Sequence, residues 1–280
     1  MKKVAVIQDM SSFGKCSLTA AIPVLSVMGV QACPLPTAIL TAQTAYDSNY
    51  CKDLTAEMPH FIEEWGKMNE TFDGIHTGFV TGEQQIDHIM QFLARFQTTD
   101  TTVLVDPVMG DMGDLYKMYT SHLLERMRAL VKQATIITPN ITECCLLTGI
   151  PYEKLHNYHE EESFMQAVEE AGQVLHAQTG AQVIITGVTS SYTEQPSISN
   201  VVIDAKQSFY HKQPFNGQSY SGTGDLFASV VIGGLLRGQS LEETIKLAEQ
   251  FLTAAIETTA KQTSLTKAGV YFEQHLGMLL

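Results

Sequence analysis

Short apolar runs alternate with amphipathic segments along most of the chain, and this alternation constrains the fold more than any other feature. Residues 4–7 form a nearly continuous apolar run, which is typical of a strand buried on both faces. Leu18, Ile22 and Leu25 follow at the spacing of one helix face. Because this pattern repeats, we predict a three-layer α/β/α fold with a mostly parallel central sheet and right-handed crossovers. Further strands are expected at 31–38, 73–79, 102–106, 135–138 and 182–187, and helices at 53–67, 83–97, 120–132, 141–148 and 160–178.

The last third of the chain departs from this alternation. Residues 199–205 and 207–212 have the pattern of short strands, and the connection between them is too short for a crossover helix. We therefore expect an antiparallel hairpin at the sheet edge. Two amphipathic stretches, 222–236 and 241–259, are expected to be the closing helices. Since no repeat or linker interrupts the pattern, the sequence predicts a single domain over residues 1–280.

The composition excludes several classes of protein. Lys and Arg number 17 against 30 Asp and Glu, a net charge of −13, so a nucleic acid partner is not expected. Five cysteines without C-x-x-C spacing fit neither a disulfide framework nor a zinc site, and we expect reduced thiols. No apolar stretch approaches the roughly 18 residues of a membrane span, and the first apolar run is too short for a signal peptide. We therefore predict a cytoplasmic protein without a membrane partner.

Small and polar residues follow six of the predicted strands. In a parallel sheet the ligand site lies beyond the carboxyl ends of the strands. Ordinary turn chemistry explains any one of these positions, whereas agreement among six favours a ligand site. The positions are 8–11, Thr37, 77–79, 106–107, 138–140 and 186–187.

Two glycines, Gly222 and Gly224, open the first closing helix with Thr223 between them. Glycine lets backbone N–H groups approach a ligand closely, and the helix start adds about half a positive charge, so we predict an anion hole. Asp225 lies in the first turn, where a carboxylate is often only a helix-stabilising residue. Beside a hole for a phosphoryl group, the same carboxylate can take the proton from an attacking hydroxyl.

Two familiar nucleotide-binding motifs are absent. Gly14-Lys15 is followed by Cys16 and lacks the upstream glycine of a P-loop, and Phe227 stands at the third glycine position of a dinucleotide fingerprint. The sequence therefore supports neither a P-loop nucleotide hydrolase nor a nicotinamide-dependent dehydrogenase.

A second cluster of oxygen-bearing side chains comprises Asp106, Asp111, Asn140 and Glu143. Such hard ligands suit Mg²⁺, which usually takes one or two protein carboxylates besides phosphates and waters. The spacing also fits a capping box, with Asn140 as the N-cap of a helix and Glu143 three residues later. The two interpretations are compatible.

Four motifs together resemble the ribokinase-like superfamily, and specifically its vitamin-kinase branch. They are G-T-G-D at 222–225, N-x-x-E at 140–143, D-P-V-M-G-D at 106–111 and I-I-T-P-N at 136–140. Within that branch the chain is similar to the bacterial pyridoxal (pyridoxamine) kinases, with the hydroxymethylpyrimidine kinases of thiamine synthesis as the alternative. The resemblance implies a ribokinase-like fold and ATP-dependent phosphorylation of a hydroxymethyl group on a small heteroaromatic ring. A non-catalytic vitamin-binding protein with the same fold is a further alternative.

The resemblance also implies roles for particular residues. Asp225 is the base, and Gly222, Thr223 and Gly224 form the anion hole around the reacting phosphoryl group. Residues 110–119 match a flexible flap over ATP. The family further implies Mg²⁺ at Glu143 and Asp106, a monovalent cation such as K⁺, and a homodimer. The residues implied in ATP binding are Asp106, Asp111, Asn140, Glu143 and Thr186.

The substrate end departs from the pyridoxal kinase pattern. Those enzymes carry Ser-His where this chain has Asp9-Met10, and His-Thr where it has Gln43-Thr44. Phe79 stands where an aromatic residue, often Tyr, is found. We expect Asp9, Gln43, Thr44 and Phe79 to bind the substrate, and an ionised Asp9 to favour compounds that bear an amine. The vitamer or pyrimidine preference stays open at this point.

Overall fold

The computed structural model describes residues 1–116, 119–155, 158–192, 194–263 and 265–280, which divide into two compact units. Unit 1 comprises Met1–Leu104 and Ser219–Leu280, and unit 2 comprises Val105–Gln218. Each is described by itself below. The single domain expected from the sequence stays a prediction.

The fold is a mostly parallel central sheet with an antiparallel hairpin and helices on both sides, as the sequence predicts. In unit 1, β1 pairs in parallel with β2 on one side and with β4 on the other. The consecutive buried apolar residues Val4, Ala5, Val6 and Ile7 explain the central place of β1, because a strand covered on both faces is apolar almost throughout. A short strand that the sequence did not predict, β3, pairs antiparallel with β2. The strand bounds are β1 (Lys3–Ser11), β2 (Gln31–Leu40), β3 (Cys51–Asp53), β4 (Gly74–Thr77) and β5 (Thr102–Val105).

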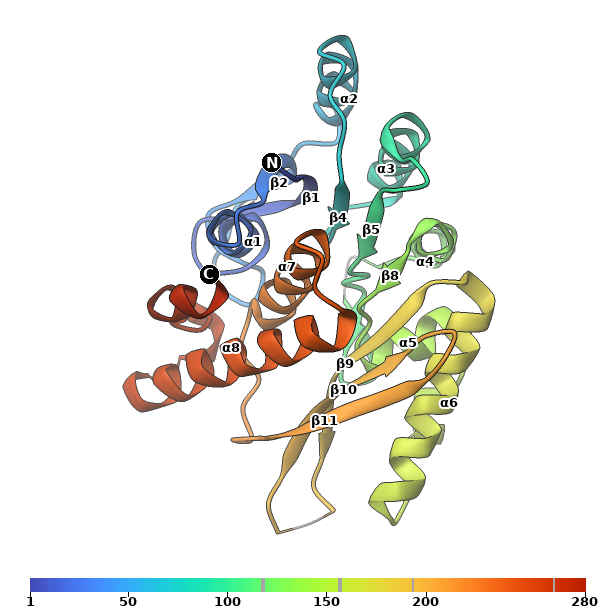
Figure 1. Cartoon of the computed structure of the whole chain (residues 1–280), viewed down its shortest axis with the longest axis vertical. Coiled ribbons are helices and arrows are strands. Elements are labelled where there is room, and N and C mark those ends of the chain that lie inside the picture. Colours follow the sequence, from blue (N-terminus) through green and yellow to red (C-terminus); the bar gives the residue numbers. More distant parts are fainter. Residues whose placement is uncertain (117–118, 156–157, 193, 264) are drawn as a thin grey trace. The chain divides into compact units, whose positions relative to one another are not determined.

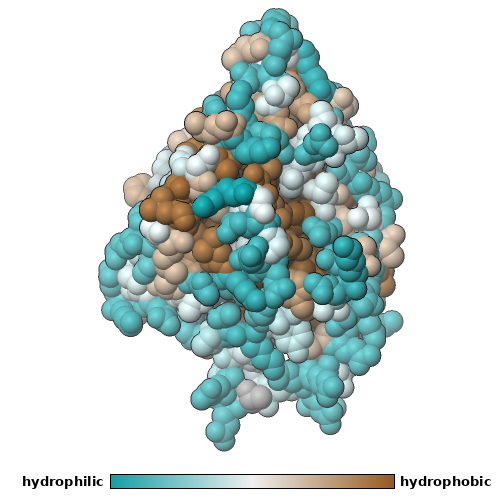
Figure 2. All heavy atoms as spheres, viewed as in Figure 1, coloured by the Kyte–Doolittle hydropathy of each residue, from teal (hydrophilic) through white to brown (hydrophobic). Residues whose placement is uncertain are grey.

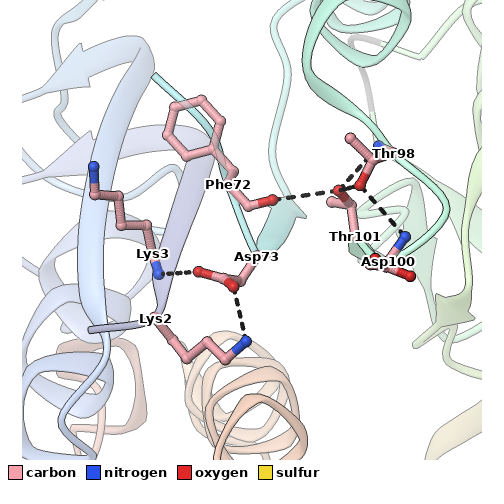
Figure 3. A network of polar contacts seen from close by, with 7 residues as sticks. All are labelled: Lys2, Lys3, Phe72, Asp73, Thr98, Asp100 and Thr101. Atoms are coloured by element: carbon pink, nitrogen blue, oxygen red, sulfur yellow. Dashed lines mark hydrogen bonds and ion pairs between the residues drawn. The ribbon is translucent and has the colours of Figure 1, made fainter. Parts of the chain in front are cut away.

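Polar contacts hold the amino ends of β1 and β4 together in unit 1 (Figure 3). The Asp73 carboxylate accepts a hydrogen bond from Lys2 Nζ at 2.8 Å and another from the Lys3 backbone N–H at 2.9 Å. Nearby, Thr101 Oγ1 donates to the Phe72 carbonyl oxygen at 3.3 Å. These contacts link the residues at the amino ends of β1, β4 and β5. Asp9, which the sequence predicts to bind substrate, lies near the opposite, carboxyl end of β1.

The helices of unit 1 pack around one apolar helix, α7. Its residues 226–234 are all buried, which is expected of a helix that is hydrophobic on every side. Both α1 and α8 contact it, and α8 runs beside it in Figure 1. The bounds are α1 (Ser17–Val27), α2 (Met58–Lys67), α3 (Glu83–Phe96), α7 (Thr223–Leu236) and α8 (Leu241–Gln262), with 3₁₀ turns η3 (Thr266–Ala268) and η4 (Phe272–Leu279).

One helix boundary predicted from the sequence was wrong. The helix expected at 53–67 begins only at Met58, and Asp53 instead ends β3. Pro59 provides the reason, because proline lacks a backbone N–H and fits best in the first turn of a helix.

In unit 2, β8 pairs in parallel with β9, while β10 pairs antiparallel with both β9 and β11. The predicted antiparallel hairpin is therefore confirmed. Figure 1 shows α6 along β9 and β10, which it contacts. The bounds are α4 (Ser121–Leu130), η1 (Val131–Gln133), β8 (Ile136–Ile137), α5 (Ile141–Thr148), η2 (Tyr152–Leu155), α6 (Glu161–Thr179), β9 (Gln182–Ser190), β10 (Ser197–Ile203) and β11 (Ser208–Pro214).

The segment expected to be a loop flap, 110–119, contains a small hairpin instead. Residues Gly110–Asp111 form β6 and pair antiparallel with Asp114–Leu115, which form β7. The two-residue connection has positive φ at both Met112 (54°) and Gly113 (89°), which suits a tight hairpin turn. Residues 117–118 of the expected flap lie outside the described residues.

The molecular face drawn in Figure 2 is mostly hydrophilic, with a group of hydrophobic residues near the C-terminal end of the chain. Among the described residues, we find no helix with both the length and the apolar character that a membrane crossing requires.

Candidate active site

Gly222 shapes the start of α7 in unit 1. Its φ is 79°, a left-handed conformation that favours glycine, and a Cβ at this position would collide with the carbonyl oxygen of Lys15. The first helical hydrogen bond runs from Leu226 N to Gly222 O at 3.0 Å. The N–H groups of Thr223 and Gly224 precede that bond and point out of the helix start, an arrangement that suits an anion.

Asp225 occupies the third position of α7 and is partly exposed. The backbone N–H of Ser17, at the start of α1, favours the ionised form of this carboxylate. Burial and the neighbouring Asp9 carboxylate raise the pKa of Asp225 to about 7, against the lowering effect of that N–H. A carboxylate of this pKa can accept and release a proton near neutral pH.

Asp9 is buried near the carboxyl end of β1, and serine hydroxyls contact both of its oxygens. Ser17 Oγ donates to Oδ1 at 2.5 Å, and Ser11 Oγ donates to Oδ2 at 2.7 Å. Burial raises the pKa of Asp9, while the two hydroxyls oppose that rise. Its predicted role in substrate binding stays a prediction.

The loop before α1 packs closely on the glycine-rich helix start. Lys15 contributes its carbonyl oxygen to the contact with Gly222, while its Nζ pairs with Glu273 at 2.8 Å and lies 4.5 Å from the centre of the Tyr271 ring. Cys16 is buried, and burial followed by the Asp225 and Asp9 charges raises the pKa of its thiol. The thiol is therefore neutral at physiological pH. All five cysteines are free, as expected from the sequence.

Gln43, in the segment after β2, contacts Ser221 just before α7 and Lys267 in η3. Its Nε2 donates to Ser221 Oγ at 3.0 Å and to the Lys267 carbonyl oxygen at 3.1 Å, and its Oε1 accepts from Ala45 N at 2.8 Å. Thr44 beside it is exposed. Phe79 is half-buried after β4, and its carbonyl oxygen accepts from Thr37 Oγ1 at 2.9 Å. The substrate-binding roles of Gln43, Thr44 and Phe79 stay predictions.

In unit 2, Glu143 is buried and its carboxylate bonds to the backbone. Oε1 accepts from Met109 N at 2.8 Å and Oε2 accepts from Asn140 N at 2.9 Å, while Asn140 Oδ1 accepts from Glu143 N at 2.9 Å. The capping box is therefore present. Burial raises the pKa of Glu143 to about 7, the backbone N–H groups lower it, and Asp111 raises it.

The first turn of α5 also holds the loop around the β6–β7 hairpin. Asn140 Nδ2 donates to the Gly110 carbonyl oxygen at 2.8 Å, and Gly113 N donates to Thr142 Oγ1 at 2.9 Å. Val108, in the same loop, has a φ of 42°, which is strained for a β-branched residue. The loop conformation therefore depends on the side chains of α5.

The structure brings most of the predicted nucleotide-site residues of unit 2 together. Asp106 directly follows β5 and is half-buried, and Asp111 is exposed in β6. Thr186 N donates to the Pro139 carbonyl oxygen at 2.8 Å, which forms a bridge between Thr186 and Asn140. Within the ranges that the structure describes, no group of three or more His, Cys, Asp or Glu side chains is arranged to hold a metal ion.

Sequence reasoning missed the contacts that the Ser11 and Ser17 hydroxyls make with Asp9, and the contact that the Thr142 hydroxyl makes with Gly113. Ser11 could have been found, because residues two apart in a strand share a face and Ser11 follows Asp9 at that spacing. The Ser17 contact depends on a turn between β1 and α1, and no local pattern predicts it.

A ribokinase-like fold, a helix that starts at glycine and an aspartate of raised pKa in its first turn define a class of small-molecule kinase. The chain belongs to the phosphomethylpyrimidine kinase family, whose model matches residues 14–269.

The chain is also similar to individual vitamin B6 kinases and to a phosphomethylpyrimidine kinase. A pyridoxine/pyridoxal/pyridoxamine kinase from Bordetella avium is 27% identical over 272 residues, which cover 91% of this chain and 85% of the relative. The structure of pyridoxal kinase from Lactobacillus plantarum is 32% identical with a TM-score of 0.87, and the match covers 100% of this chain and 97% of the other. A Bacteroides thetaiotaomicron structure, named as a phosphomethylpyrimidine kinase and solved with pyridoxal, is 35% identical with a TM-score of 0.90, and the match covers 99% of this chain and 95% of the other.

Proposed function

We propose that the chain is a pyridoxal kinase. It transfers the γ-phosphoryl group of ATP to the 5′-hydroxymethyl group of pyridoxal, pyridoxamine or pyridoxine. The observation that carries the proposal is Asp225, a partly exposed carboxylate whose pKa is raised to about 7 in the first turn of a glycine-started helix. The related kinases that act on B6 vitamers support the choice of substrate.

Asp225 acts as the general base in this proposal. Its carboxylate takes the proton of the 5′-hydroxyl, the hydroxyl oxygen bonds to the γ-phosphorus, and the bond from that phosphorus to the leaving oxygen of ADP breaks. The N–H groups around Gly222, Thr223 and Gly224 stabilise the negative charge on the phosphoryl oxygens. The fixed backbone at Gly222 keeps those groups in place before the substrates bind.

The residues implied in ATP binding all lie in unit 2 and carry oxygen or nitrogen in their side chains. They are Asp106, Asp111, Asn140, Glu143 and Thr186. Asn140 and Glu143 shape the loop that carries Asp111, and Thr186 bridges to Asn140. The set also fits Mg²⁺, because one or two carboxylates suffice beside phosphates and waters, and each oxygen of Glu143 keeps a lone pair beyond its backbone hydrogen bond. Glu143 and Asp106 would hold the ion, and bound Mg²⁺ supplies charge neutralisation on the transferring group.

A second candidate function is hydroxymethylpyrimidine kinase, which Asp9 and the family match favour. The two functions are separated by ADP formation from ATP and Mg²⁺ with pyridoxal, pyridoxine, pyridoxamine and hydroxymethylpyrimidine in parallel. We expect turnover with the B6 vitamers and a kcat lower by on the order of 10²–10⁴ in Asp225→Asn. Turnover confined to the pyrimidine would establish the second function, and vitamer binding without turnover would establish a binding protein.

The remaining expectations from the family belong to the same proposal. We propose a cytoplasmic homodimer that requires Mg²⁺ and is stimulated by K⁺. Sedimentation equilibrium tests the dimer, and replacing K⁺ by Na⁺ in the ADP assay tests the monovalent cation.

A further inference from the structure

Residues 79–81 of unit 1, which follow β4, are held by side chains from two strands on the far side of β1. Thr37 Oγ1, in β2, donates to the Phe79 carbonyl oxygen at 2.9 Å. Asp53, in β3, accepts a hydrogen bond from the Thr81 hydroxyl. Because β1 lies between β4 and β2, the segment must cross the carboxyl end of β1 to reach these partners.

The pairing of β1 with β2 is irregular where the segment crosses. The register shifts between residues 8 and 10 of β1, so that Asp9 alone stands opposite both Thr37 and Ala38 of β2. Such a bulge re-aims the side chains of the strand that carries it, and bulges are frequent beside active sites. Here both the hydroxyl and the carbonyl oxygen of Thr37, which is fully buried, bond to groups outside the β1–β2 pair.

Gln85 connects the two ends of this arrangement from the first turn of α3. The residue is fully buried. Its Oε1 accepts from Thr81 N at 2.9 Å, and its Nε2 donates to the Thr37 carbonyl oxygen at 2.8 Å and to Thr55 Oγ1 at 3.0 Å. An amide can accept and donate at once, which a carboxylate or an ammonium group cannot do. Gln85 therefore closes a ring of hydrogen bonds that runs through Thr37 and the backbone of residues 79–81.

Phe79 carries the half-buried aromatic side chain of the held segment. Asp9 and Phe79 each lie two residues beyond the last pair of β1 with β4, which joins Ile7 to Thr77. Both therefore lie at the carboxyl edge of the sheet in this unit, where parallel sheets bind their ligands. An aromatic side chain fixed at this edge can pack against a heteroaromatic ring.

We propose that Gln85 is a positioning residue for Phe79. It holds residues 79–81 across the end of β1, which keeps the Phe79 ring in place against the ring of the substrate and so strengthens vitamer binding. This inference rests on the proposed function, in which Phe79 binds the substrate, and it gives α3 a part in binding that the sequence did not predict.

Gln85→Met tests the proposal, because it keeps the length of the side chain and removes both its acceptor and its donors. We expect the Kd for pyridoxal, measured by calorimetry, to rise about tenfold, an effect within reach of the lost hydrogen bonds, while kcat and the KM for ATP stay within about twofold. Gln84→Met is the matched control, since Gln84 is exposed in the same turn of α3, and it should leave all three values unchanged.

A double-mutant cycle with Phe79→Ala separates positioning from a general loss of structure. If Gln85 acts through Phe79, Gln85→Met should add less than about twofold to the Kd of Phe79→Ala, whereas independent effects would multiply. Full multiplication would overturn the proposal, and so would an unchanged Kd in Gln85→Met. If Gln85→Met does not fold, Thr37→Val, which removes the donor to the Phe79 carbonyl oxygen, decides by the same cycle.

Amide hydrogen exchange measures the hold on the segment without any ligand. The Thr81 N–H donates to Gln85 Oε1, so it should exchange at least about tenfold faster in Gln85→Met than in the wild type or in Gln84→Met. Equal exchange in all three proteins would overturn the proposal. A wild type that binds no vitamer would overturn both the proposed function and this role of Gln85, whereas a wild type that binds pyridoxal without turnover would refute the proposed function alone.

Discussion

The Glu143 carboxylate joins the cap of α5 to the loop before β6, because its Oε1 accepts a hydrogen bond from the Met109 N–H at 2.8 Å. Its other oxygen accepts from Asn140 N at 2.9 Å within the capping box. The residue therefore does more than cap a helix, since it also fixes the loop that carries Asp111.

Glu143→Gln should raise the Mg²⁺ concentration for half-maximal rate several-fold. The amide has one acceptor oxygen in place of two and no charge, so one backbone N–H loses its partner and the metal loses a carboxylate. ADP formation at varied Mg²⁺ measures the effect. Glu243→Gln is the matched control, because Glu243 closes the capping box of α8 with Ser240. Superimposable Mg²⁺ curves for wild type and both variants would show that Glu143 only caps its helix.

Gly222→Ala should lower kcat at least about a hundredfold, the usual cost of losing one donor of an anion hole. The new Cβ would collide with the Lys15 carbonyl oxygen and displace the helix start. Gly238→Ala is the matched control, since Gly238 has a similar φ of 86° with no atom within 4 Å of an added Cβ. It should cost about 1 kcal/mol of stability and leave kcat unchanged. Equal kcat values for the two variants would place the phosphates elsewhere.

Asp225 should make the protein less stable at alkaline pH. Burial raises the pKa of its carboxyl to about 7, whereas an unfolded aspartate ionises near about 4. The folded state therefore binds more protons between these values, and the stability contributed by the protonated form is lost as pH rises through about 7.

The expected consequence is that Asp225→Asn is more stable than wild type at pH 8 by about 1–2 kcal/mol, a value reduced for the partial exposure of the site. The difference should vanish at pH 4. Thermal unfolding across this pH range measures it, with the exposed Asp100→Asn as the control. A constant difference at all pH values would contradict the raised pKa.

The alternation of apolar runs and amphipathic segments predicted the fold, because burial determines both patterns. A strand buried on both faces is a continuous apolar run, and a helix buried on one face has apolar residues at helical spacing. The helix 141–148 was predicted with the bounds of α5, and Asn140 marks its start in the sequence as the N-cap. Strand β3 was missed because its three residues are all exposed and carry no apolar pattern. The β6–β7 hairpin was missed for a related reason, as two-residue strands are too short for any periodicity.

The site was predictable where function depends on a local motif. Gly222, Asp225 and the Asn140–Glu143 pair each belong to one short segment, so their helix-start geometry follows from the sequence. The contacts of Asp9 with Ser17 and of Gln43 with Ser221 were not predictable, because both depend on tertiary packing. Hydrogen bonds of that kind depend on side-chain placement, which the order of strands and helices does not determine.

The most direct test of the account is the turnover of Asp225→Asn with ATP, Mg²⁺ and pyridoxal. Asn has the shape of Asp but accepts no proton, so kcat should fall on the order of 10²–10⁴ while ATP binding, measured by calorimetry, stays at the wild-type level. A kcat within about threefold of wild type, well below the effect expected of a general base, would show that Asp225 is not the base.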